Sequence, residues 1–224
     1  MKKLLDGIIE FRRKLTPSQR QEFANLALDQ APDCLFIACS DSRVVPNLFA
    51  STNPGDLFVI RNVGNLIPAC GARGFAGDGQ SIGAAIEFSL QELGVKEIVV
   101  CGHSECGAMQ ALLAEKRLPE SPHLESWLAH GKPSLQKFKS GLKIDPQLRP
   151  QNQLSQVNVL QQLEHLRSYP LVREGLHQRK LRVHGWWFDI ASAEVYAIDE
   201  TLKRVDLIDE EHVRRMLPNP SRSG

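Results

Sequence analysis

The pattern of apolar and polar residues changes character near Pro32. Before this point, apolar residues between positions 2 and 28 recur at helical spacing, and Thr16 followed by Pro17 is typical of a helix N-cap and its first helical position. The segment therefore predicts two amphipathic helices. These helices either cover the core of their own domain or embrace a second subunit, and the pattern leaves both arrangements open.

After Pro32, short continuous apolar runs alternate with stretches of helical spacing. Continuous runs of this length are typical of strands that are buried on both faces. The predicted strands are 34–39, 57–60, 98–101, 181–184 and 195–198. The predicted helices are 82–93, 105–115, 154–166 and 210–217. This alternation predicts an α/β fold, with a parallel central sheet, crossover helices, and strand 195–198 at an edge.

Length and composition limit the organisation of the chain. Its 224 residues suit one large α/β domain, and a hydrophobic content of 42% is enough to form a core. We therefore expect an N-terminal helical arm (1–29), a single α/β domain (30–217) and a flexible tail (218–224). The apolar runs are too short to span a bilayer. Acidic residues interrupt the N-terminal apolar pattern before a signal-peptide cleavage site could follow, so we expect a cytoplasmic protein.

Net charge and cysteine content limit the partners to be expected and the state of the cysteines. The formal net charge of +1 gives no electrostatic reason to expect a nucleic acid or an anionic membrane as partner. The chain has 5 cysteines, and an odd number in an intracellular protein favours free thiols or metal ligands over a disulfide framework.

Two short motifs follow predicted parallel strands. Cys39, Asp41 and Arg43 come directly after the first strand, and His103 and Cys106 follow the strand at 98–101. The carboxyl ends of parallel strands adjoin the crevice where α/β sheets bind ligands. Two thiolates and one imidazole are a good ligand set for zinc, and three protein ligands leave the fourth tetrahedral position open, as in catalytic sites. A thiol redox site is the alternative, but it would need a C-x-x-C pair that the sequence lacks.

These paired motifs resemble the zinc motifs of the β-class carbonic anhydrases. The resemblance covers residues 30 to 200 approximately and continues through segments 54–58, 60–63, 83–87, 172–176 and 183–187. It implies a zinc lyase in which zinc-bound hydroxide attacks CO₂ to give bicarbonate, with Cys39, His103 and Cys106 as the zinc ligands. General similarity is closest to the cyanobacterial carboxysomal members, which implies a role in carbon fixation, a place inside the carboxysome, and scaffold or shell proteins as partners.

The resemblance also implies roles for residues around the metal. Arg43 keeps Asp41 ionised and off the zinc, while Asp41 accepts a hydrogen bond from the zinc-bound water or hydroxide. Matching family positions predict the residues of the CO₂ pocket: Gln30, Phe58, Val63, Phe88 and Gly107. In the family this pocket draws on two subunits, which implies a homodimer or a multiple of dimers. Plant members have a tyrosine where this chain has Phe88, so a hydroxyl is missing.

A regulatory site of some bacterial members is not matched. Those enzymes bind bicarbonate through a Trp, an Arg and a Tyr, whereas the corresponding positions here hold Phe36, Arg61 and Phe188. We therefore predict an open zinc site without that bicarbonate switch.

Two alternatives to CO₂ hydration are hydrolysis of carbonyl sulfide or carbon disulfide, and a scaffold-binding protein with a structural zinc. The pair Asp41 and Arg43 argues against the structural zinc, which needs neither residue.

Overall fold

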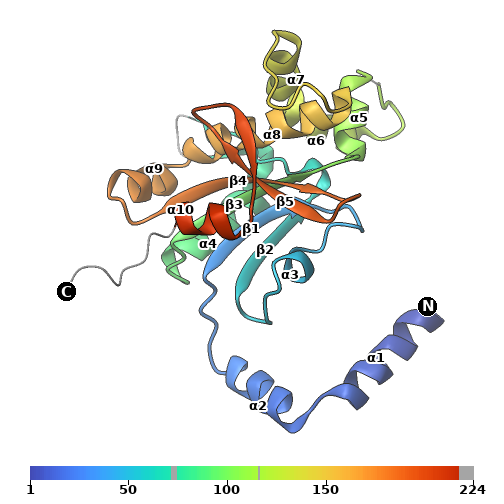
Figure 1. Cartoon of the computed structure of the whole chain (residues 1–224), viewed down its shortest axis with the longest axis vertical. Coiled ribbons are helices and arrows are strands. Elements are labelled where there is room, and N and C mark those ends of the chain that lie inside the picture. The colour runs from blue at the N-terminus through green and yellow to red at the C-terminus, as the bar shows by residue number, and fades with distance from the viewer. Residues whose placement is uncertain (72–74, 116, 217–224) are drawn as a thin grey trace. The chain divides into compact units, whose positions relative to one another are not determined.

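The computed structural model describes residues 1–71, 75–115 and 117–216, so the predicted tail lies outside the described residues. The chain divides into two compact units, Met1–Ala31 and Pro32–Gly224 (Figure 1). None of the helices in the described ranges has both the length and the apolarity needed to cross a bilayer.

The N-terminal unit contains helices α1 (Lys2–Lys14) and α2 (Pro17–Leu26), which confirms the predicted pair. The Thr16 hydroxyl accepts a hydrogen bond from the backbone N–H of Gln19, and the Gln19 side chain accepts one from the backbone N–H of Thr16. This reciprocal capping box fixes the start of α2. The larger apolar side chains of α1 are exposed: Leu4, Leu5, Ile8, Ile9 and Phe11.

The second unit is built on a six-stranded sheet of order β2-β1-β3-β4-β5-β6. Its strands are β1 (Cys34–Cys39), β2 (Leu57–Asn62), β3 (Glu97–His103), β4 (Arg182–Asp189), β5 (Glu194–Asp199) and β6 (Arg204–Leu207). The first four pair in parallel, and β5 and β6 pair antiparallel. The predicted α/β fold with a mostly parallel sheet is confirmed.

The prediction that strand 195–198 lies at the edge is wrong. That segment belongs to β5, which pairs with β4 on one side and with β6 on the other. The β6 strand has only four residues, and Arg204 and Asp206 are polar. It therefore lacks the continuous apolar run by which the other strands are detected, and its place at the edge depends on pairing with β5.

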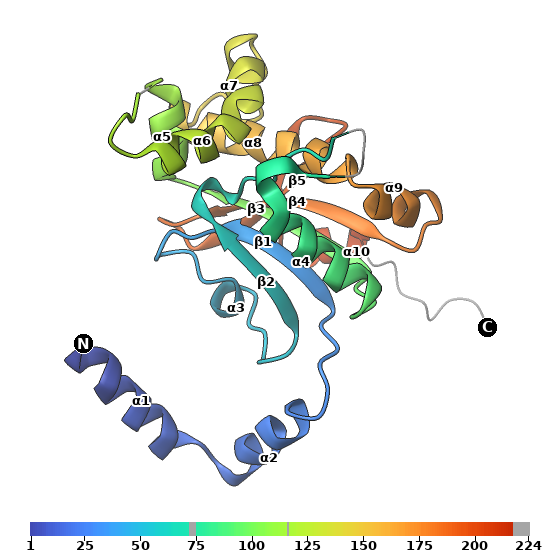
Figure 2. The ribbon, with the colours of Figure 1, turned by 180° about the vertical axis from the view of Figure 1, so that it is seen from behind.

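Helices flank the sheet and connect its strands (Figure 2). They are α3 (Pro46–Phe49), α4 (Gln80–Gln91), α5 (Gly107–Leu113), α6 (Pro122–Leu128), α7 (Lys132–Lys139), α8 (Pro150–Arg167), α9 (Pro170–His177) and α10 (Glu210–Met216). Because side chains alternate along a strand, Leu35 and Ile37 of β1 enter a core that includes residues of α4 and α8, whereas Phe36 enters a second core with Phe49 of α3. Helix α8 packs against β3 and β4.

The helix predicted at 105–115 begins later than expected. The α5 helix starts at Gly107, and Cys106 is its N-cap residue. Glu105 has a φ of 57°, in the left-handed region, so it cannot belong to a right-handed helix. The turn at Glu105 thus separates the end of β3 from the start of α5.

Candidate metal centre

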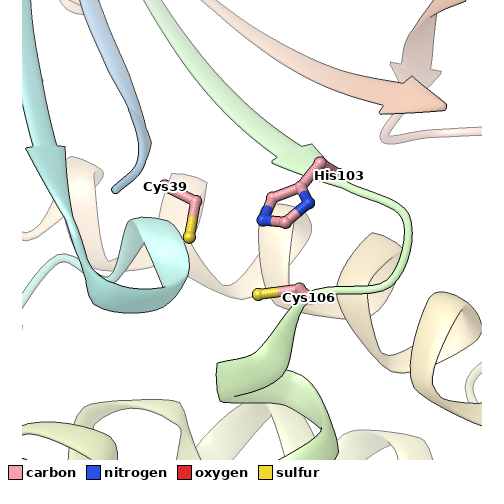
Figure 3. A group of neighbouring side chains, drawn as sticks. All are labelled: Cys39, His103 and Cys106. Carbon is pink, nitrogen blue, oxygen red and sulfur yellow. The ribbon is translucent and has the colours of Figure 1, made fainter. Parts of the chain in front are cut away.

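The three predicted ligands meet at the carboxyl ends of two neighbouring strands. Cys39 ends β1, His103 ends the adjacent β3, and Cys106 caps α5. Their possible ligand atoms all lie within 4.8 Å of one another, and all three residues are buried. Figure 3 shows both sulfurs and the imidazole ring directed toward a common space. The structure therefore brings together the complete Cys-His-Cys set.

The histidine presents one unsatisfied nitrogen to this space. His103 Nδ1 lies 2.8 Å from the backbone carbonyl of Ser104, so Nδ1 carries the proton and donates it to that oxygen. The other nitrogen, Nε2, is buried and has no hydrogen-bond partner among the described residues. A buried polar atom without a partner is costly, and an Nε2 lone pair fixed in this tautomer is a typical metal ligand.

Cys39 and Cys106 are linked by a hydrogen bond, so their pKa values shift in opposite directions. The pKa of Cys39 is lowered to about 4, chiefly by a hydrogen bond from Cys106 and also by the backbone N–H groups of Gly64 and Asp41, which together outweigh the effect of burial. The same hydrogen bond and burial raise the pKa of Cys106. Without a metal the pair shares a proton, which a dication would replace. Two thiolates and one imidazole fit zinc.

Beside the ligands, Asp41 and Arg43 form a two-pronged ion pair. Arg43 Nε lies 2.9 Å from Asp41 Oδ1, and Arg43 Nη2 lies 2.7 Å from Oδ2. These bonds hold the pKa of the Asp41 carboxyl well below its usual range. Arg43 Nη2 also donates to the backbone carbonyl of Glu105 at 3.2 Å. The guanidinium thus links the Cys39 loop to the loop that carries His103 and Cys106.

The three residues at the positions of the bacterial bicarbonate site, Phe36, Arg61 and Phe188, make other contacts in this structure. Arg61 donates to the backbone carbonyls of Cys39 at 3.1 Å and Asp41 at 2.6 Å, so its guanidinium supports the loop of the metal centre. Aromatic rings pack around the other two positions. The pairs, with their centroid distances, are Phe36–Trp186 (5.8 Å), Phe36–Phe49 (6.0 Å) and Phe49–Phe188 (4.7 Å, stacked).

The predicted pocket residues occupy several elements. The rings of Phe58 on β2 and Phe88 on α4 contact each other, with centroids 5.8 Å apart. Val63 follows β2 directly, and Gly107 is the first residue of α5, where a Cβ would meet no atom within 4 Å. Gln30 belongs to the N-terminal unit. Contact of these residues with substrate stays a prediction.

Sequence reasoning missed the polar side chains that support the site from α8. Asn152, Ser155 and Asn158 are buried and bind backbone groups of Glu105, His103 and Gly64, respectively. The available signal was their regular spacing of three residues, which begins two residues before the helix predicted at 154–166 and continues into it. Gly64, whose N–H lies 3.3 Å from Cys39 Sγ, was also missed.

Comparison with named relatives identifies the family. The model of the family described as carbonic anhydrase matches residues 34–195. A carbonic anhydrase of Pseudomonas aeruginosa is 39% identical over 224 residues, which cover 100% of this chain and 99% of the relative. A carbonic anhydrase of Synechococcus elongatus is 43% identical over 219 residues, which cover 96% of this chain and 77% of the relative.

Solved structures agree with the fold. The β-carbonic anhydrase CcaA superimposes with a TM-score of 0.82 at 39% identity, covering 93% of this chain and 98% of that chain. One of two tetrameric β-carbonic anhydrases of Sordaria macrospora gives 0.76 at 29% identity, covering 88% and 95%. By its sequence, its fold and its Cys-His-Cys centre, the chain belongs to the β class of the carbonic anhydrase family.

Proposed function

We propose that this chain hydrates CO₂ reversibly at a zinc ion held by Cys39, His103 and Cys106, with Asp41 and Arg43 orienting the attacking water. The observation that carries the proposal is the buried Nε2 of His103, which has no hydrogen-bond partner in the described part of the chain and lies within 4.8 Å of two thiol sulfurs. When bound, the metal supplies Lewis acidity that makes water a competent nucleophile near neutral pH.

The role proposed for Asp41 follows from its contacts with Arg43. Both carboxylate oxygens accept hydrogen bonds from the guanidinium, so the carboxylate stays ionised and is held in one orientation. Oδ1 accepts from both the backbone N–H and Nε of Arg43, whereas Oδ2 accepts only from Nη2 and keeps a lone pair. With this lone pair Asp41 accepts a hydrogen bond from the attacking water, which directs the water's own lone pair at the carbon of CO₂. Arg43 thereby also keeps Asp41 from becoming a metal ligand.

The pocket proposed for CO₂ is mostly apolar, which suits a small molecule without charge. Phe58, Val63 and Phe88 supply apolar surface, Gln30 supplies an amide, and Gly107 allows its backbone N–H to approach an oxygen of the substrate. Val63 is 41% and Phe88 43% exposed, as expected of residues that a second subunit covers. A homodimer or a multiple of dimers is therefore part of the proposal, and the similar Sordaria macrospora enzymes are described as tetrameric.

We also propose that the site stays open and lacks the bicarbonate switch. The ring packing of Phe36 and Phe188 and the backbone contacts of Arg61 support this, because positions 36 and 188 hold phenylalanines, which lack the polar groups of the Trp and Tyr that bind bicarbonate. A crystal structure of the zinc-loaded protein at neutral pH checks it. Asp41 seen as the fourth metal ligand would show the proposal to be wrong.

The carboxysomal location stays a prediction. The identity of 43% to a cyanobacterial carbonic anhydrase supports it, but a relative from Pseudomonas aeruginosa matches over the full chain. Fractionation of the source cells separates the two locations. Activity that sediments with carboxysomes supports the prediction, and activity confined to the soluble fraction contradicts it.

Stopped-flow CO₂ hydration tests the function and the role of Asp41 together. We compare the wild type, Asp41→Ala and the control Ser42→Ala, an exposed serine on the same loop, at equal zinc content. Asp41→Ala should lower the rate by about 10- to 100-fold, as expected for a group that orients a metal site, whereas Ser42→Ala should match the wild type. An inactive zinc-loaded wild type refutes the enzyme, and equal rates for the wild type and Asp41→Ala refute the dyad. The same assay with carbonyl sulfide tests the alternative substrate.

A further inference from the structure

Helix α8 buries a row of polar side chains next to the metal centre. Asn152, Ser155 and Asn158 are 6%, 1% and 0% exposed, and we call these three residues the α8 stripe. They are spaced three residues apart, so successive members are neighbours on the helix surface. Burying a polar group is costly unless it is hydrogen-bonded, so the partners of the stripe identify what it stabilises.

Asn152 holds the turn that precedes Cys106. Its Oδ1 accepts the backbone N–H of Glu105 at 2.8 Å, and its Nδ2 donates to the Glu105 carboxylate at 3.1 Å. Arg149 forms an ion pair with the same carboxylate. Glu105 has the left-handed φ of 57° and presents its carbonyl to Arg43. Asn152 therefore holds a strained residue between the end of β3 and the Cys106 ligand.

Ser155 holds the backbone of His103. Its hydroxyl donates to the His103 carbonyl at 2.8 Å, and its oxygen accepts the indole N–H of Trp187 at 3.1 Å. Because the indole can only donate, the hydroxyl proton of Ser155 must point to the carbonyl. This bond fixes the last residue of β3, from which the imidazole projects.

Asn158 holds the loop that supports Cys39. Its Nδ2 donates to the carbonyl of Gly64 at 3.1 Å, while its Oδ1 accepts hydrogen bonds from Ser134 at 2.8 Å and Gln162 at 2.9 Å. These partners fix the orientation of the amide. The N–H of the same Gly64 faces Cys39 Sγ, so Asn158 orients the residue that donates to this ligand.

The close approach of α8 to the sheet lets such short side chains reach these groups. A Cβ at Gly102 of β3 would lie 2.7 Å from a methyl of Val159, and a Cβ at Gly185 of β4 would lie 3.0 Å from the other methyl. Both glycines therefore allow a helix–strand distance that any larger residue would increase. Because of this short distance, the side chains of the α8 stripe reach the backbone groups directly.

We propose that the α8 stripe positions the metal centre, with one member for each ligand: Asn152 for Cys106, Ser155 for His103 and Asn158 for Cys39. The inference rests on the proposed function, in which these three ligands hold zinc. The stripe residues are positioning residues, since none of them contacts the ligand atoms themselves. Each instead fixes a backbone group of the ligand or of a residue that adjoins or supports it.

The test measures the metal site directly. Zinc affinity is determined by chelator competition, and the visible spectrum of the Co²⁺-substituted protein reports the ligand geometry. We expect Asn152→Ala, Ser155→Ala and Asn158→Ala to weaken zinc binding by about 10- to 100-fold and to shift the Co²⁺ bands, as is typical of groups that orient metal ligands. Ser155→Thr keeps the hydroxyl and should therefore show wild-type zinc affinity and the wild-type Co²⁺ spectrum.

Gln153→Ala is the matched control. Gln153 is a buried amide on the same helix, but it donates to the carbonyls of Pro146 at 3.1 Å and Leu148 at 2.6 Å, away from the ligand loops. It should keep wild-type zinc affinity and the wild-type Co²⁺ spectrum, even where the free energy of unfolding falls. If Asn158→Ala does not fold, the comparison of Ser155→Ala with Ser155→Thr tests the positioning role, because Ser155→Ala is the smaller change.

The outcomes distinguish failure of this inference from failure of the proposed function on which it rests. A wild type that binds no zinc refutes the proposed metal centre itself. A wild type that binds zinc, with stripe variants equal to it in affinity and spectrum, refutes only the positioning role. Equal losses of affinity in the stripe variants and in Gln153→Ala also refute that role, because they indicate general destabilisation.

Discussion

Gly64 meets several requirements at once in the loop after β2. Its φ is +80°, its N–H lies 3.3 Å from Cys39 Sγ, and its carbonyl accepts a hydrogen bond from Asn158. A Cβ at this position would lie only 2.8 Å from the Cβ of Ala108 on α5. Glycine therefore satisfies both the backbone conformation and the close contact with α5 next to the metal centre.

The first prediction separates these two requirements of Gly64. Gly94 has a similar φ of +64°, but a Cβ there would meet nothing within 4 Å. Gly94→Ala should therefore cost only the left-handed backbone penalty, about 1–2 kcal/mol. Gly64→Ala should cost about 1–3 kcal/mol more because it overpacks against Ala108. Urea unfolding of the zinc-loaded proteins measures both losses, and equal losses would contradict the prediction.

At the scale of elements, the pairing of β3 with β4 begins with a charge cluster. Glu97 and Arg182 are register partners at the start of the two strands. Arg182 Nε lies 2.7 Å from the Glu97 carboxylate, and His184 Nε2 lies 2.8 Å from it. Burial acts to raise the pKa of Glu97, but the hydrogen bonds from Arg182 and His184 outweigh it and lower the pKa below its ordinary value of 4.5.

This direction of shift gives the second prediction. Because the folded protein binds the proton of Glu97 less tightly than the unfolded chain, the ionised carboxylate stabilises the fold above its ordinary pKa. The stabilisation is lost as the pH falls below 4.5 and the carboxylate becomes protonated. The difference in free energy of unfolding between the wild type and Glu97→Gln should thus shrink as the pH falls below about 4.5.

Denaturant titrations across this pH range measure the difference. Glu120 is exposed in a turn and serves as the matched control. Glu120→Gln should leave the free energy of unfolding close to that of the wild type throughout. A Glu97→Gln difference that does not shrink as the pH falls below about 4.5 would show that the ionised carboxylate is not stabilised by its partners.

At the scale of the whole molecule, exposed apolar surface is found in both units. In the arm, Leu4, Ile8 and Phe11 of α1 are 66%, 64% and 56% exposed. In the α/β unit, Val63 and Phe88 of the predicted pocket are exposed as well. Contiguous exposed apolar surface is typical of an interface, so both surfaces fit the proposed assembly of subunits.

The third prediction concerns that assembly. Ile8→Asp places a charge on the apolar face of α1 and should shift the protein from a dimer, or a multiple of it, toward a single 25.0 kDa chain. The CO₂ hydration rate should fall with it, because the proposed pocket draws on two subunits. Asp6→Asn, a change between polar residues on the same helix, is the control. Sedimentation equilibrium measures the mass, and an unchanged mass for Ile8→Asp would refute a role of this helix face in assembly.

Residue types and their local spacing were sufficient to predict much of the fold and the centre of the site. The apolar run at 34–39 predicted a buried strand, and Thr16 with Pro17 predicted the start of α2. Asp41 lies two residues from Arg43, and His103 lies three from Cys106, so these groups can meet within one loop whatever the rest of the chain does. Residue type and short spacing therefore determined the ion pair and the pair His103 and Cys106, whereas Cys39 joins them through the pairing of β1 with β3.

Tertiary structure alone decided what supports that centre. Asn158 reaches Gly64 across 94 positions, and Ser155 reaches His103 across 52. Arg61, which a family pattern assigned to a regulatory position, donates instead to the backbone of Cys39 and Asp41. Such contacts depend on strand register and on how closely α8 approaches the sheet. Local periodicity encodes neither, because each arises only when segments far apart in the sequence pack together.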